Sequence, residues 1–186
     1  MIPADQLAKN FQSDRFAETR VTNRANSLVN PKSGLANDYL NVFNEISMLI
    51  ENYPAMPELG SAILSWRVTP YKEYFQKSML PGRENAIEAW GQIDPKLHDA
   101  MLAITAQIEN LAKIAKTYIK CQLRDEITAQ TLEKACSEIT ELMRGCIFQA
   151  TQMVNFGIAV KSVAAQERAD QIMARLKPRE ASKSLS

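Results

Sequence analysis

Side chains that could form a binding surface recur at helical spacing in SGLANDYLNVFNE, residues 33–45. Residues three and four apart share one side of a helix, so Asn37, Asn41 and Asn44 lie together, with Asp38 and Glu45 beside them. Asparagine and aspartate form helices less readily than the Lys, Glu, Gln and Arg that usually cover a solvent face. This stripe predicts hydrogen bonding to neighbouring loops of the chain, to another protein or to a small polar ligand.

Aromatic and basic side chains alternate in SWRVTPYKEYF, residues 65–75. Such a pattern can stack on nucleic-acid bases, but residues 54–95 hold four basic and five acidic residues, so no positive groove is indicated. Core aromatics with charged ends that reach solvent are the simpler interpretation. Taken with the asparagine stripe, the predicted partner- or ligand-binding residues are Asn37, Asp38, Asn41, Asn44, Glu45, Trp66, Arg67 and Tyr71.

His98 is the only histidine, and it could serve as a general base or accept a phosphoryl group. It falls in the first turn of an expected helix, next to Asp99. A phosphotransfer module typically has a mid-helix histidine followed by lysine and small residues, whereas Met101 and Leu102 stand here. An ordinary helix-terminal histidine is therefore favoured, and a phosphotransfer protein using His98 is an alternative.

Recognisable catalytic and metal-binding motifs are missing from the sequence. There is no Glu-x-x-His pair for a di-iron site, no GxSxG, and no glycine-rich phosphate loop. Cys121, Cys136 and Cys146 lie on apolar stripes without CxxC spacing, as expected of reduced thiols that act as small hydrophobes. We predict no catalytic residue, no metal and no cofactor.

Length and charge set further limits. A chain of 186 residues fits one domain, and 22 basic against 21 acidic residues give a net charge of +1. This balance provides no overall field for nucleic acid. Since no signal-peptide pattern and no run of about 18 apolar residues occurs, we expect a cytoplasmic protein without a membrane span.

Helical periodicity recurs along the chain without sustained strand-like alternation, which predicts an all-α fold. Apolar residues from Leu35 to Tyr53 form one face of an amphipathic helix. Five prolines between positions 54 and 95 limit that region to short helices, at about 57–66, 70–78 and 83–91.

Two long helices are expected after the proline-rich region. Asp94 and Pro95 suit the N-cap and first position of one, a break falls at 125–128, and each helix carries a 4-3 apolar series. They predict a long antiparallel hairpin, covered by the 35–53 helix and by a segment at 158–176. The expected domains are a flexible or partly helical leader at 1–32 (short helix near 6–19), one helical bundle at 33–177 and a disordered tail at 178–186.

The stretch GLANDYLNVFNEISMLIENYPAMPE, followed by Trp66, YKEYF and RENAIEAW, resembles an uncharacterised family of small bacterial proteins over about residues 30–92. This resemblance implies a bacterial, cytoplasmic, single-domain protein and brings no activity with it.

These observations favour a non-enzymatic helical module that binds another protein in a regulatory or structural role. Surface methionines such as Met48, Met56 and Met79 would suit an adaptable interface. One alternative is a small-molecule-binding or enzymatic bundle that uses the aromatic segment with Asn41 and Arg67; the other is phosphotransfer through His98. The 4-3 series also allow pairing across a two-fold axis, so a homodimer is a further expectation.

Overall fold

The computed structural model describes residues 28–159 and 164–176, and its all-α architecture confirms the predicted fold class. The described residues contain no β-strand, only an isolated bridge between Val29 and Ala36. Their helices, in chain order, are the 3₁₀ helix η1 (Asn37–Leu40), α2 (Asn41–Asn52), the 3₁₀ helix η2 (Pro57–Leu59), α3 (Gly60–Ser65), α4 (Tyr71–Lys77), α5 (Arg83–Trp90), α6 (Pro95–Leu123), α7 (Ala129–Phe156) and α8 (Ala164–Ala174).

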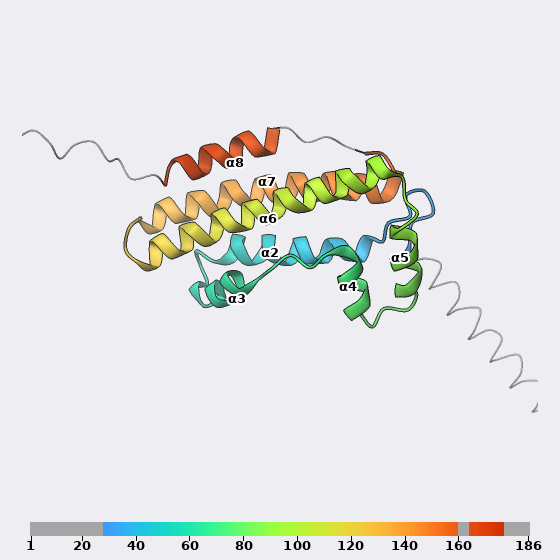
Figure 1. Ribbon diagram of the computed structural model, residues 1–186. Coiled ribbons are helices and arrows are strands. Elements are labelled where there is room, and N and C mark those ends of the chain that lie inside the picture. The colour runs from blue at the N-terminus through green and yellow to red at the C-terminus, as the bar shows by residue number, and fades with distance from the viewer. Residues whose placement is uncertain (1–27, 160–163, 177–186) are drawn as a thin grey trace, which may run out of the picture.

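The two longest helices, α6 and α7, lie side by side and run in opposite directions (Figure 1). The Asp94 carboxylate accepts hydrogen bonds from the backbone of Lys96 and Leu97, so it caps α6 before Pro95 as predicted. Thr128 caps α7 by accepting from the backbone N–H of Thr131. These caps fix where each long helix begins.

The other helices cover the α6–α7 pair on different sides. Helix α2 packs along α7, and α8 lies on the opposite side of the pair (Figure 1). Helix α3 lies near the turn between α6 and α7, while α4 and α5 pack together at the far end. The Tyr118 hydroxyl on α6 donates a buried 2.8 Å hydrogen bond to the Ile172 carbonyl, which ties α8 to the bundle.

The first predicted helix is shorter than the sequence pattern suggested. Leu35 and Ala36 precede η1, and Ala36 is extended, with φ −100° and ψ 131°. Its backbone is held by the bridge to Val29 and by a hydrogen bond to Tyr71, so the chain becomes helical only at Asn37. Leu28 and Val29, which were placed in the leader, pack against the core because their apolar side chains are partly buried there.

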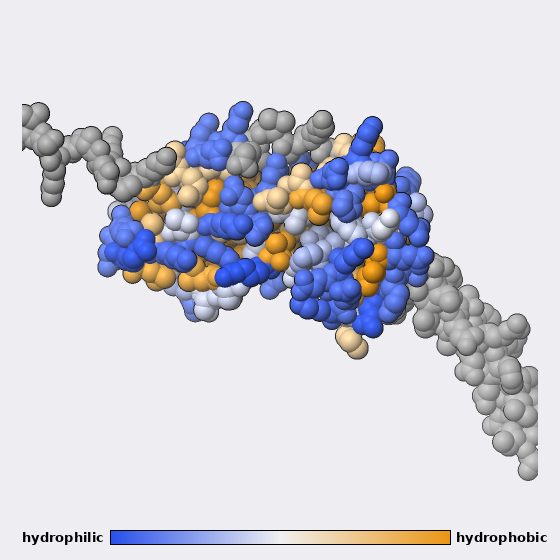
Figure 2. Space-filling model, in the orientation of Figure 1, coloured by the Kyte–Doolittle hydropathy of each residue, from blue (hydrophilic) through white to orange (hydrophobic). Residues whose placement is uncertain are grey.

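The end of α7 is fixed by Gly157, which adopts φ +68° and donates its N–H to the Met153 carbonyl. The expected helix near 6–19 and the tail at 178–186 lie outside the described residues. Among the residues that are described, no helix combines the length and apolar character needed to cross a bilayer. The face of the molecule in Figure 2 is mainly hydrophilic, with separate hydrophobic patches.

Candidate functional site

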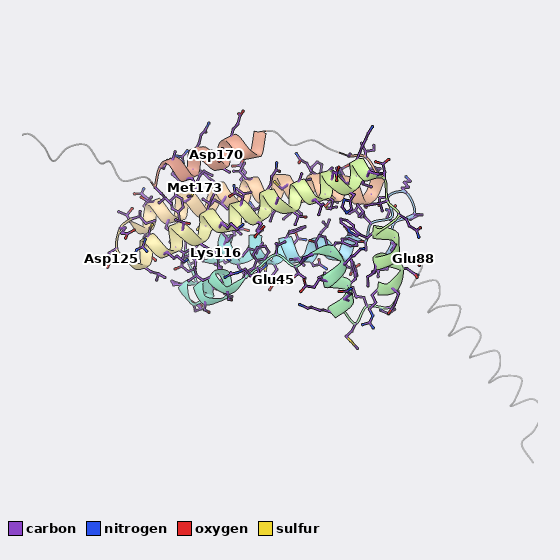
Figure 3. All side chains as sticks on the ribbon, viewed as in Figure 1. Glu45, Glu88, Lys116, Asp125, Asp170 and Met173 are labelled. Atoms are coloured by element: carbon purple, nitrogen blue, oxygen red, sulfur yellow. The ribbon has the colours of Figure 1, made fainter. Side chains whose placement is uncertain are left out.

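The asparagine stripe is at the surface, but its residues do not form one site. Asn37, Asn41, Asn44 and Glu45 are exposed, and Asp38 is half-buried. Figure 3 shows Glu45 on α2, away from α6. A hollow of about 420 Å³ beside α4 has Asp38 and Asn41 in its lining, whereas Asn44 belongs to a separate groove.

That groove runs between α2 and α7 and has a volume of about 360 Å³. Two large apolar side chains stand on its walls: Met48 from α2 is 57% exposed and Phe148 from α7 is 64% exposed. The complete lining is Asn44, Ser47, Met48, Glu51, Arg144, Ile147, Phe148 and Thr151. Met48 lies within the polar stripe, and the described residues leave its side chain open.

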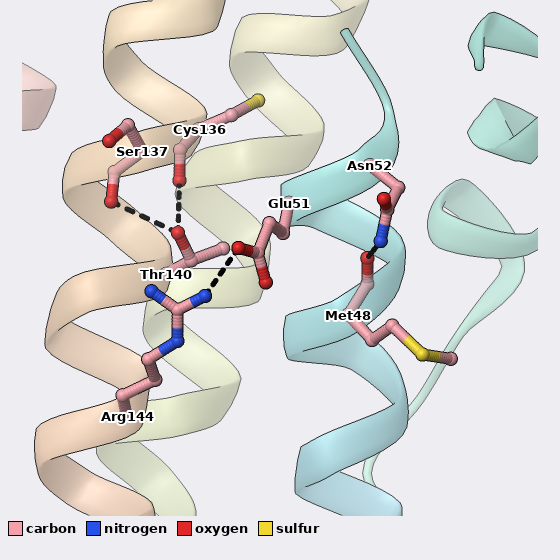
Figure 4. A network of polar contacts seen from close by, with 7 residues as sticks. All are labelled: Met48, Glu51, Asn52, Cys136, Ser137, Thr140 and Arg144. Atoms are coloured by element: carbon pink, nitrogen blue, oxygen red, sulfur yellow. Dashed lines mark hydrogen bonds and ion pairs between the residues drawn. The ribbon is translucent and has the colours of Figure 1, made fainter. Parts of the chain in front are cut away.

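An ion pair bridges the groove, because the Arg144 guanidinium on α7 reaches the Glu51 carboxylate on α2 (Figure 4). Residues 33–66 contain four acidic side chains and neither Lys nor Arg. Of these four, Glu51 alone has an ion-pair partner within the described chain. The acidic residue in the groove lining, Glu51, is thus paired, whereas Glu45 on the same helix lies outside the lining and has no ion-pair partner in the described chain.

Gly145 follows the groove residue Arg144 on α7 and is exposed, but it does not itself line the groove. It lies on α7 one turn before Phe148, and a Cβ built there would have no heavy atom within 4 Å. Glycine inside a helix costs about 0.5–1 kcal/mol relative to alanine. No packing contact of the described chain requires glycine at this position.

Tyr71 belongs to the core rather than to an open binding surface. Its ring packs edge-on against Tyr39 and stacks on Trp90, with centroid distances of 5.0 Å and 4.3 Å. Its hydroxyl oxygen accepts a 2.8 Å hydrogen bond from the buried Ala36 N–H. Burial also raises its pKa, which agrees with a structural tyrosine.

The neighbouring Tyr39 is also buried and is also fixed by a hydrogen bond through its hydroxyl group. Its hydroxyl donates a 2.9 Å hydrogen bond to the Thr69 carbonyl, and burial raises its pKa to about 12, although a hydrogen bond with Thr105 opposes the shift. Neither phenol is therefore suited to proton transfer near neutral pH.

A third hollow, of about 270 Å³, opens beside this aromatic cluster where α4, α5 and α6 meet. Sequence reasoning missed it, because its walls come from segments that only tertiary packing brings together. Its lining is Tyr39, Val68, Pro70, Tyr71, Lys72, Trp90, His98, Leu102 and Thr105. Tyr71 is the one member of the predicted site residues in this lining.

Trp66 and Arg67 have structural roles at the end of α3. The Arg67 guanidinium donates hydrogen bonds to the carbonyls of Leu64, Ser65 and Trp66, over 2.8–3.3 Å. The Lys116 ammonium donates to the same Trp66 carbonyl and lies 5.8 Å from the centre of its ring. Burial, and next the charge of Arg67, lower the pKa of Lys116, whose place on α6 is labelled in Figure 3.

Nucleophilic and metal-binding groups are not assembled in the described residues. The three cysteines are free and buried. Burial raises the pKa of both Cys136 and Cys146 to about 11, which keeps these thiols protonated and poorly nucleophilic at neutral pH. Within residues 28–159 and 164–176, no three His, Cys, Asp or Glu side chains gather as a metal site would require.

Comparison with known proteins finds no matching protein-family model, no matching curated protein and no matching solved structure. The resemblance to uncharacterised bacterial proteins therefore stays an expectation from the sequence. Function has to be inferred from the geometry of this chain.

Proposed function

We propose that this chain is a non-enzymatic helical module that binds another protein across the groove between α2 and α7. The observation that carries the proposal is the pair of exposed apolar side chains, Met48 and Phe148, on opposite walls of that groove. Burying side chains of this size on association is favourable, and buried aromatic anchors commonly dominate such interfaces. Methionine adds adaptability, because its unbranched side chain can repack around a partner.

The shape and charge of the groove favour an amphipathic helix as the partner segment. A helix laid between two helices inserts apolar residues spaced three or four apart, and the gap between Met48 and Phe148 offers such anchors a place. Glu45 lies on the same helix as the groove residues and has no ion-pair partner in the described chain. A partner helix with basic residues beside its apolar stripe would complement this charge.

Gly145 supports close approach of such a helix. Small residues let the backbones of two helices come closer together, and here the space above the glycine is open. The stability lost by glycine within α7 would be offset when a partner packs against it.

The phosphotransfer alternative is not favoured by the surroundings of His98. Its ring centre lies 4.6 Å from that of Trp90, its side chain is 34% exposed, and it lines a hollow rather than an open flat face. A phosphoacceptor histidine needs room for a partner protein to reach its nitrogen in line. The interaction module therefore remains the better-supported function.

Site-specific photocrosslinking would test this proposal directly. A benzophenone amino acid at position 148 should crosslink one protein in the native host, through a basic amphipathic segment identified by mass spectrometry. The matched control is the same amino acid at Met79, which is 92% exposed but lies on the turn between α4 and α5. The purified partner should then bind Phe148→Asp at least about tenfold more weakly than Met79→Asp.

Several outcomes would overturn the proposal. Equal crosslinking from positions 148 and 79, or unchanged affinity for Phe148→Asp, would remove the groove as a docking site. Crosslinks only to a second copy of the chain would mean that the groove forms the expected homodimer and does not bind another protein. Crosslinks only to residues 1–27 of the same molecule would mean that the chain covers its own groove. Circular dichroism establishes that each variant is folded.

A further inference from the structure

The hollow beside the aromatic cluster is a second candidate site, distinct from the α2–α7 groove. Val68 and Leu102 contribute aliphatic walls, and Tyr39, Tyr71 and Trp90 contribute rings. Ligand pockets usually have volumes of about 300–1,000 Å³. At about 270 Å³, this hollow suits a ligand of about one ring.

The arrangement of the rings argues against a cationic ligand. Tyr71 stacks on Trp90 at 4.3 Å with an angle of 16° between the planes, and His98 packs on the same indole at 4.6 Å. Trp90 is consequently only 7% exposed, and little of its π face is left for a cation.

The charged groups at the hollow also favour an anionic ligand over a cationic one. Lys72 is an exposed lining residue without an ion-pair partner in the described chain, and no carboxylate is part of the lining. His98 also lines the hollow, and its Nδ1 atom lies 3.6 Å from the carboxylate of Asp99, which is not a lining residue. An ammonium and an imidazole on the rim of an apolar hollow can together hold a carboxylate.

We propose that this hollow binds a small aromatic carboxylate. The ring of the ligand packs against Val68 and Leu102, and its carboxylate meets Lys72 and His98 at the opening. The proposal does not rest on the docking function of the groove, since the two surfaces share no lining residue.

A titration of the ¹⁵N-labelled full chain with benzoate tests the site. The chain has two tryptophans, so the two indole N–H resonances serve as reporters. The Trp90 signal should shift and saturate in the millimolar range or below, whereas the Trp66 signal should stay in place. Benzamide, which has nearly the same shape but no charge, should bind about threefold to fivefold more weakly, and benzyltrimethylammonium should not compete.

Two lysines on α4 provide a matched pair of variants. Lys72 lines this hollow, whereas Lys77 pairs with Glu73 and lines a different one. Lys72→Met should weaken benzoate binding about threefold to fivefold, and Lys77→Met should leave it unchanged. Both side chains are exposed, so neither variant should disturb the fold.

The proposal fails if the Trp90 signal shows no saturable shift at tens of millimolar benzoate. Equal affinity for benzoate and benzamide would remove the role of the carboxylate, and tighter binding of benzyltrimethylammonium would reverse the inferred charge preference. Equal losses in the two lysine variants would mean a general charge effect rather than a site. None of these outcomes bears on crosslinking at position 148, so the two proposals fail independently.

Discussion

The Ala36 N–H donates a buried 2.8 Å hydrogen bond to the Tyr71 hydroxyl oxygen, which joins the segment before η1 to the first residue of α4. Both residues are almost completely buried, so neither group has water as a substitute. The bond holds Ala36 extended at the point where the amphipathic helix was expected to have begun already. It also fixes the ring that stacks on Trp90.

Removing that hydroxyl should destabilise the fold. In Tyr71→Phe the Ala36 N–H loses its acceptor while the ring stays in place, which should lower the free energy of unfolding by about 1–3 kcal/mol. Denaturant unfolding followed by circular dichroism measures the change. Tyr74→Phe is the control, since Tyr74 is only half-buried, and it should lose less than Tyr71→Phe. Equal effects would show that the Ala36 bond is not special.

Gly145 within α7 and Gly157 directly after it should respond in opposite directions to substitution by alanine. Gly157 has φ +68°, and a Cβ there would lie 2.6 Å from the Lys32 carbonyl oxygen, so Gly157→Ala should cost about 2 kcal/mol or more. Gly145 lies within the helix with open space around it, so Gly145→Ala should stabilise the fold by about 0.5–1 kcal/mol. Thermal and urea unfolding of both variants measure the two changes.

Gly145→Ala also separates stability from binding. The added methyl group should stabilise the free protein and weaken partner binding, because it keeps a docked helix further from α7. If the variant is both more stable and equally able to bind, close approach at Gly145 does not contribute to the interface.

Local signals predicted the helices well because those signals act within one or two turns. The capping group of Asp94 and the rigid ring of Pro95 each determine where α6 begins without distant contacts. The proline-rich region likewise contains short helices close to the expected positions. The all-α class follows from such signals and from helical periodicity.

The candidate sites were less accessible from sequence because they depend on contacts between distant segments. The asparagines of the stripe are exposed, but only Asn44 among them lines the α2–α7 groove, whose other wall comes from residues about a hundred positions later in the chain. Trp66 and Arg67 were predicted as site residues from type alone, whereas their bonds stabilise the end of α3. The Trp90–His98 contact crosses the α5–α6 turn, and no local pattern marks it.

Alkaline pH should weaken the fold through its buried thiols. Burial raises the pKa of Cys136 and Cys146 from the usual 9.0 to about 11, so the unfolded chain loses these protons first. The contribution of the protonated thiols to the free energy of unfolding is fully present below pH 9 and is lost as the pH rises from 9 through 11. At pH 10 each thiol should reduce the free energy of unfolding by about 1 kcal/mol relative to pH 8.

A double variant isolates this effect. Cys136→Ala/Cys146→Ala should start from a lower stability at pH 8 because the core loses volume, but should decline less steeply between pH 8 and 10. Urea unfolding at several pH values gives both slopes. Parallel slopes would assign the alkaline loss to other groups, such as Tyr39, whose pKa is raised to about 12.

Of the three asparagines in the stripe, Asn44 should contribute to partner affinity, whereas Asn37 and Asn41 should not. Asn44 lines the α2–α7 groove, whereas Asn37 and Asn41 lie outside it. All three are exposed, so alanine at any of them should change the free energy of unfolding by no more than about 0.5 kcal/mol. Affinity for the partner captured at position 148 should fall for Asn44→Ala and stay constant for Asn37→Ala, as measured by calorimetry. An equal loss of affinity in both variants would mean that the interface extends along the whole stripe. No loss in either would confine the interface to the apolar walls of the groove. In that case Phe148→Asp should still abolish most binding.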